Sequence, residues 1–204
     1  YGATEVKTPH IDALANGGVR LADYYAAAPI CSPSRTGLLT GCYPRRTGGE
    51  VWVHRPDSQR GIPPSRLTLA ELFKKKGYAT ACIGKWHLGD NYPMRPIDQG
   101  FGEALVHNGG GIGQPSDPPG NAYFDPILQH NGKAETHQGY CTDIFFDAAL
   151  DHIEAARDAI VRGKHTRDPR SGLAHRGTAR CPRRPRAHRR RPHALSRDTV
   201  DRGP

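Results

Sequence analysis

The chain has 204 residues, which is enough for one domain with a buried core. Its net charge of +9 is unevenly spread, because residues 159–204 hold thirteen arginines, one lysine and three aspartates, or +11, and residues 1–158 carry −2. The basic charge therefore gives no reason to expect an acidic substrate, and the sequence has no apolar run long enough to indicate a membrane span.

The first predicted element is a helix that begins at Pro9 and runs to Ala15. Thr8 is its candidate N-cap, and Pro9 suits the first turn because it has no N–H group to lose there. Gly17 and Gly18 predict its end.

A second helix is predicted from the residues around Cys31, which stands just before the expected helix start. Pro33 suits the first turn, and Ser32 and Ser34 can cap or solvate the free N–H groups of that turn. A helix N-terminus attracts anions, and Arg35, four residues beyond the cysteine, falls on the same side of the turn. Because a guanidinium binds phosphate or sulfate oxygens in pairs, these residues predict a reactive sulfur beside an oxyanion site. A structural thiol in a Pro/Ser turn is the alternative.

The next predicted unit is a helix followed by a strand. Thr68 is the candidate N-cap, lysines 74 to 76 lie at the negative end of the helix, and Gly77 closes it. Residues 78–83 then predict a short buried strand, in which Cys82 is a small core residue.

The segment from Gly84 to Gly89 leaves the carboxyl end of this strand, where open α/β sheets bind their ligands. Lys85 and His87 are two residues apart, so an extended backbone would point both side chains the same way. On spacing alone such a pair is weak evidence for a site.

Residues 31–41 (CSPSRTGLLTG) and 84–89 (GKWHLG) together closely resemble the two signature segments of the sulfatase family. That family belongs to the alkaline-phosphatase-like superfamily. A sulfatase-maturating or formylglycine-generating enzyme oxidises its cysteine to formylglycine, whose hydrated aldehyde is the nucleophile. The resemblance also implies a divalent cation, which we expect to be Ca²⁺.

The resemblance implies a role for each matching residue. Formylglycine made from Cys31 would be the nucleophile and a metal ligand, Arg35 would orient it, and Lys85 and His87 would contact the sulfate. His107 is a further candidate for substrate binding, with a solvated loop histidine as the alternative. The implied activity is arylsulfatase-like hydrolysis of a sulfate ester. A related phosphonate or phosphate ester hydrolase, or a non-catalytic product, is the alternative.

The fold implied is α/β, a partial sulfatase mixed sheet flanked by helices. Residues 19–28 resemble the strand and approach that deliver the nucleophile. Residues 106–114 are Gly-rich and are expected to form a loop near the mouth of the site. Residues 142–158 predict an amphipathic helix. Its expected core-facing residues are Phe145, Phe146, Ala149, Leu150 and Ile153.

Two regions, 1–158 and 159–204, are predicted. The first, residues 1–158, is a partial catalytic domain. We expect the chain to be an N-terminal fragment, because the resemblance assigns further metal ligands outside it. Residues 1–204 alone should then have little sulfatase activity.

The second region, residues 159–204, lacks aromatic residues and apolar periodicity, which predicts disorder. A shifted reading frame would explain its composition, with a basic nucleic-acid-binding tail as the less favoured alternative. A periplasmic or secreted location is expected from the family.

The remaining cysteines give no further site. The five cysteines of the chain lack the spacing of a zinc site. Cys42 and Cys141 could be free or paired, and the sequence does not decide between these.

Overall fold

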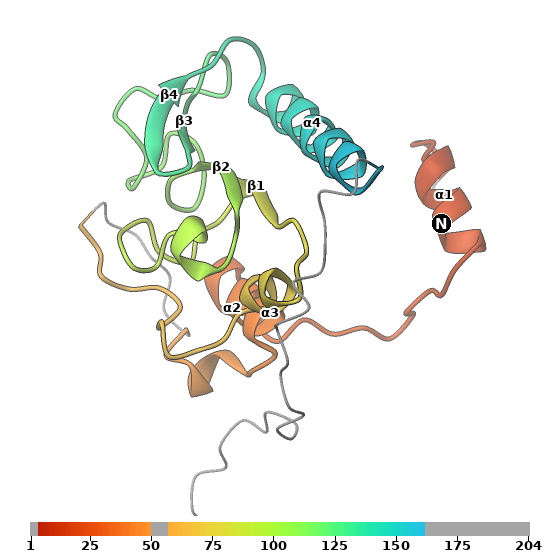
Figure 1. Ribbon diagram of the computed structural model, residues 1–204, viewed down its shortest axis with the longest axis horizontal. Helices are drawn as coiled ribbons and strands as arrows, with labels where there is room; N and C mark the ends of the chain where they lie inside the picture. The colour runs from red at the N-terminus through yellow and green to blue at the C-terminus, as the bar shows by residue number, and fades with distance from the viewer. Residues whose placement is uncertain (1–3, 50–56, 162–204) are drawn as a thin grey trace, which may run out of the picture. The chain divides into compact units, whose positions relative to one another are not determined.

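The structure is a computed structural model that describes residues 4–49 and 57–161 (Figure 1). Within these residues, a four-stranded mixed sheet has the strand order β1-β2-β3-β4. The strands are β1 (Ala81–Lys85), β2 (Glu103–His107), β3 (Ile127–His130) and β4 (Lys133–Thr136). The helices are α1 (Pro9–Asn16), α2 (Cys31–Thr40), α3 (Leu69–Lys75) and α4 (Cys141–Val161), with short 3-10 turns at Pro44–Arg46 and Pro96–Gln99. The α/β class predicted from the sequence is confirmed.

The sheet combines one parallel pair with two antiparallel pairs. β1 and β2 are parallel, and their register sets Lys85 opposite His107 at the carboxyl ends of both strands. β2 pairs antiparallel with β3, and β3 with β4. Asn131 and Gly132 form the two-residue turn between β3 and β4 with φ values of 51° and 82°, the backbone that an Asn-Gly hairpin turn requires.

Apolar side chains form one cluster on each side of the sheet. Val106 of β2 lies in one cluster with Ile62, Trp86 and Leu88, against which Leu39 of α2 packs. The neighbouring residue of β2 lies in the other cluster, against which α4 packs. The period of two along a strand therefore places α2 and α4 on opposite faces of the sheet (Figure 1).

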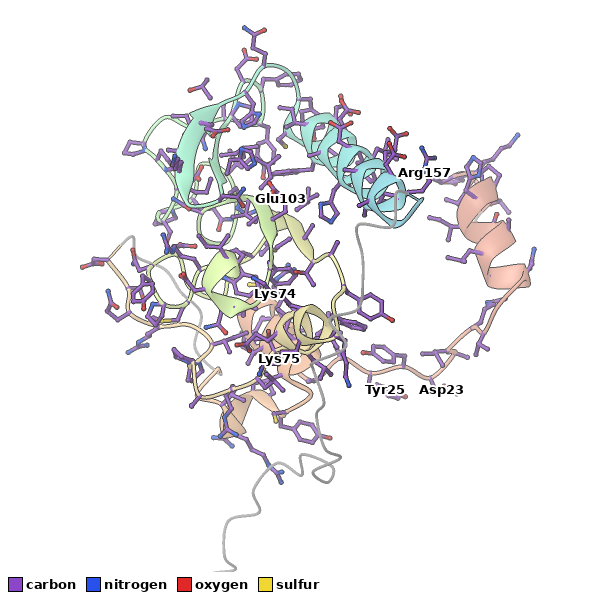
Figure 2. All side chains as sticks on the ribbon, in the orientation of Figure 1. Asp23, Tyr25, Lys74, Lys75, Glu103 and Arg157 are labelled. Atoms are coloured by element: carbon purple, nitrogen blue, oxygen red, sulfur yellow. The ribbon has the colours of Figure 1, made fainter. Side chains whose placement is uncertain are left out.

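Local capping explains where α3 begins. The Thr68 hydroxyl accepts a hydrogen bond from the Glu71 N–H at 3.1 Å, and the Glu71 carboxylate accepts one from the Thr68 N–H at 2.8 Å. This capping box confirms the predicted N-cap. Lys74 and Lys75 lie in the last turn of α3, where cations favour the helix dipole (Figure 2). α1 also begins where expected, but Thr8 donates to the Asp12 carboxylate at 3.1 Å and caps no N–H group.

The strand expected over residues 19–28 is absent from the described part of the chain, and this prediction was wrong. The backbone there is irregular, and Val19, Leu21, Tyr24 and Tyr25 are exposed. A strand needs a partner for its N–H and C=O groups. Residues 19–28 pair with no strand of the described sheet, and the edge of β1 opposite β2 has no partner among the described residues. The apolar side chains alone therefore do not make this segment a strand.

The strand expected over residues 78–83 begins later, at Ala81, and includes Lys85. It is half-buried and not fully buried, because only its β2 side is paired within the described residues. Residues 106 and 107 were expected in a loop, but they end β2 and are buried.

α4 covers residues 141–161 and confirms the predicted helix, but its buried side was only partly predicted. Phe145 packs against the core with Ile144 and Ala148. Phe146, Leu150 and Ile153 are 67%, 58% and 62% exposed, so their predicted burial was wrong. Only one face of the helix packs against the described part of the sheet, and these three side chains lie outside that face.

Cys31, Cys82 and Cys141 are free thiols in the structure, so of the two cysteines left open by the sequence, Cys141 is not paired with another described cysteine. Cys82 is partly buried and packs against the cluster around Trp86, as predicted for a small core residue. In the described part of the chain, no helix is long and apolar enough to cross a membrane. The predictions of disorder, a shifted frame or nucleic-acid binding were made for the basic tail, residues 159–204. Residues 159–161 belong to α4, so the predicted start of this tail was wrong, and residues 162–204 lie outside the described residues.

Candidate active site

Cys31 is the first residue of α2, whereas the sequence analysis placed it just before the helix. Its neighbour Ile30 is the N-cap in extended conformation and provides no side-chain cap. The predicted capping by Ser32 was wrong: its buried hydroxyl donates to the carbonyl oxygen of His87 at 2.7 Å. The start of α2 is therefore attached directly to the segment that contains His87.

Arg35 makes a second connection between the same two segments. Its Nε donates to the carbonyl oxygen of Trp86 at 2.8 Å, and a terminal nitrogen donates to that of Lys85. Burial is the main influence on this guanidinium and lowers its pKa. Arg35 thus holds a positive charge near Cys31 and fixes the carboxyl end of β1 to α2.

Lys85 and His87 both lie against one loop, residues 109–113, which we call the glycine loop. The Lys85 Nζ donates to the carbonyl oxygen of Gly110 at 2.8 Å. A Cβ atom built on Gly110 would lie 3.1 Å from Cε1 of the His87 ring, so the ring packs on this glycine. The extended backbone expected from Lys85 to His87 is not observed, because His87 has a φ of 56°, in the left-handed region. The His87 side chain is buried.

His107 is not a solvated loop histidine: it ends β2 and is buried. Its Nδ1 lies 3.0 Å from the carbonyl oxygen of Asn108, and its ring centroid is 6.5 Å from that of Phe145. Burial is the largest influence and lowers the pKa of His107. The positive charges of Lys85 and Arg35 also lower the pKa of His107, so His107 lies close enough to these two residues to interact with them electrostatically.

Two aspartates of this region, the half-buried Asp90 and the buried Asp117, were missed by the sequence analysis. Asp90 accepts the Gly109 N–H at 3.0 Å. Asp117 accepts the Gly113 N–H at 2.8 Å and the Asn121 amide at 2.7 Å. The sequence contains only weak signals for these two residues. Asp90 directly follows the Gly-Lys-Trp-His-Leu-Gly segment, and Asp117 precedes a Pro-Pro pair.

The described residues do not form a metal site by themselves. Within residues 4–49 and 57–161, no group of three or more His, Cys, Asp or Glu side chains could hold a metal ion. Calcium takes six to eight oxygen ligands. The matured Cys31 would supply only part of such a shell, so the described residues do not fit the implied cation on their own.

Hydrogen bonds from Ser32 and Arg35 thus join the Cys31 motif to the Lys85–His87 motif, about fifty residues away in the sequence. Comparison with known proteins identifies the family that has these motifs. The sulfatase family model matches residues 1–160. The chain belongs to the sulfatase family. Membership implies a formylglycine and a metal in general terms.

Relatives and solved structures agree with this assignment. The chain is 47% identical to steryl-sulfatase of Mus musculus over 116 residues, which are 52% of this chain and 19% of that protein. It is 45% identical to arylsulfatase A of Homo sapiens over 103 residues, 50% of this chain and 20% of that protein. The chain thus spans about a fifth of the length of these curated relatives.

Among solved structures, the chain is similar to Ps i-CgsB, which was crystallised in complex with k-i-k-neocarrahexaose. The TM-score is 0.68 at 29% identity, and the match covers 76% of this chain and 37% of the other.

Proposed function

We propose that the protein hydrolyses a sulfate ester with a formylglycine made from Cys31. The observation that carries the proposal is the hydrogen bonding between α2 and the end of β1. The Ser32 hydroxyl binds the backbone of His87, and Arg35 binds the backbone of Trp86 and Lys85. These bonds hold a candidate nucleophile, a guanidinium, an ammonium and an imidazole in one region.

The chemistry explains why a formylglycine would be used in place of the thiol. A thiolate that attacked a sulfate ester would form a stable thiosulfate. In the hydrated aldehyde, one hydroxyl attacks sulfur and releases the alcohol, leaving a sulfate ester on the former Cys31 carbon. The second hydroxyl then loses its proton, the C–O bond to sulfate breaks, and the aldehyde is restored. Water rehydrates it for the next cycle.

The described side chains support defined parts of this reaction. Lys85 has three donor hydrogens and uses one for Gly110, so two can reach sulfate oxygens. Negative charge builds on these oxygens in the transition state, and a fixed cation stabilises it. Arg35 supplies a second positive charge and holds the Lys85 backbone in place. His87 would hydrogen-bond the diol or the leaving group, and substrate contact by His107 stays a prediction.

Three further elements of the proposal rest on the family resemblance. The cation is proposed to be Ca²⁺, with no ligand assigned here except the matured Cys31. The partner is a formylglycine-generating or sulfatase-maturating enzyme. The location is periplasmic or secreted, which fractionation of the native host would test.

An aryl sulfate assay on site variants tests the proposal. The longest form that the gene encodes is co-expressed with a maturation enzyme and purified. Replacement of Lys85, His87 or Arg35 by Ala should each reduce turnover by about two to four decades. Arg35→Lys should not restore activity fully, because the planar fork is lost. Lys133→Ala, at an exposed lysine of β4, is the matched control.

Two results would contradict this assignment. Near-normal turnover in Lys85→Ala would remove Lys85 from the site. Hydrolysis of an aryl phosphate or phosphonate but of no aryl sulfate would favour the alternative ester hydrolase.

A further inference from the structure

We propose that Asp117 and Asp90 are positioning residues that fix the glycine loop and, through it, Lys85 and His87. The inference rests on the proposed function, because it concerns the same site. Neither aspartate matches a signature segment of the family, and neither needs to touch the substrate for this role.

Asp117 fixes the distal end of the glycine loop. One carboxylate oxygen accepts both the Gly113 N–H at 2.8 Å and the Asn121 side-chain amide at 2.7 Å. Asn121 in turn binds the carbonyl oxygen and the N–H of Ile127 at 2.9 and 2.8 Å, at the start of β3. The loop end is therefore connected to the sheet by an unbroken series of hydrogen bonds.

Asp90 fixes the proximal end. Its carboxylate accepts the Gly109 N–H at 3.0 Å, and it directly follows the segment that contains Lys85 and His87. Gly109 has a φ of 58°, and a Cβ atom there would lie 2.5 Å from Cβ of Ser116. The loop backbone thus passes close to its neighbours at this end and has little room to shift.

The part of the loop between these two anchors is the part that contacts the site. The carbonyl oxygen of Gly110 accepts a hydrogen bond from the Lys85 ammonium, and Gly110 lies against the His87 ring. A displacement of the loop would move the acceptor of Lys85 and the surface under His87 together. Anchoring at Gly109 and Gly113 therefore sets the position of both candidate sulfate-binding side chains.

Chemical labelling of Lys85 in the 204-residue chain tests this inference without requiring turnover. The protein is treated with a trace of acetic anhydride, and acetylation of each lysine is followed by peptide mass spectrometry, with Lys133 as the internal reference. Asp117→Ala should raise the relative labelling rate of Lys85 about threefold to tenfold, because the ammonium loses its fixed acceptor. Asp117→Asn should restore slow labelling, since an amide oxygen can accept the same two hydrogen bonds.

Asp125→Ala is the matched control, because Asp125 also accepts a glycine N–H, that of Gly139 at 2.8 Å, in an exposed loop. It should leave Lys85 labelling unchanged. If Asp117→Ala does not fold, Asp90→Ala and Asp90→Asn give the same comparison from the other end of the loop.

Unchanged Lys85 labelling in a folded alanine variant, or equal labelling in the alanine and asparagine variants, would overturn the positioning role. The proposed function has a separate outcome in the same experiment. Inorganic sulfate should slow the labelling of Lys85 in the wild-type chain. Absence of that protection would count against Lys85 as a sulfate ligand and would leave the comparison between the Asp117 variants intact.

Discussion

Replacement of Asp90 by Asn should change how the stability of the protein depends on pH. Burial is the largest cause that raises the pKa of Asp90 from 3.8 to about 6; the Gly109 N–H opposes the rise, and the charge of Asp117 adds to it. An asparagine of the same shape keeps an oxygen for the Gly109 N–H and removes the buried charge. The perturbation therefore isolates the cost of ionising this side chain in the folded protein.

The direction and size of the effect follow from this pKa. Because it is higher in the folded protein than in the unfolded chain, the folded state keeps its proton to a higher pH. The wild-type free energy of unfolding is therefore unaffected by this group below about pH 4, falls between about pH 4 and 6, and stays lower above that range. A rise of about two pH units corresponds to about 3 kcal/mol. Asp90→Asn should recover about 1–3 kcal/mol at pH 7, since an amide accepts a weaker hydrogen bond than a carboxylate.

Denaturant unfolding of both proteins at pH 4 and pH 7, at equal ionic strength, measures this effect. The quantity of interest is the difference between variant and wild type, which cancels the titration of other groups. The gain at pH 7 should exceed that at pH 4 by about 1–3 kcal/mol. Asp125→Asn removes one charge from an exposed loop and serves as the control for net charge. An equal difference at both pH values would refute the reasoning.

Two further predictions concern the core and the start of α3. Leu128→Ala, at a fully buried position of β3, should lower the free energy of unfolding by about 2–5 kcal/mol, whereas Leu150→Ala, on the exposed side of α4, should change it by less than about 0.5 kcal/mol; denaturant unfolding compares the two. Thr68→Ala should cost about 1–2 kcal/mol in the same assay, because it removes the cap of the Glu71 N–H and leaves the buried carbonyl oxygen of Gln99 without its 2.7 Å hydrogen bond.

Some elements could be predicted from the sequence because local chemistry determines them. The helix that starts at Cys31 follows from Pro33 in its first turn, and α3 follows from a capping box. The position of Lys85 at the carboxyl end of a strand follows from an apolar run that a glycine-rich segment ends. Each of these signals lies within a few residues of the element that it predicts.

Other elements depend on contacts between distant segments, which periodicity does not reveal. β2 has only five residues, and its burial includes His107. Residues 19–28 carry strand-like side chains but find no strand partner within the described residues. Ser32 has the composition of an N-cap, yet its hydroxyl binds a carbonyl oxygen fifty-five residues away. The aspartates that anchor the glycine loop likewise acquire their roles only from the fold.

The most direct test of the account is the chemical state of Cys31 after co-expression with a formylglycine-generating enzyme. Peptide mass spectrometry should show loss of sulfur and gain of oxygen at Cys31, together with reaction of the new aldehyde with a hydrazide. Cys42, Cys82 and Cys141 should remain thiols. If Cys31 stayed an unmodified thiol while a known sulfatase in the same cells was converted, the central claim would be contradicted.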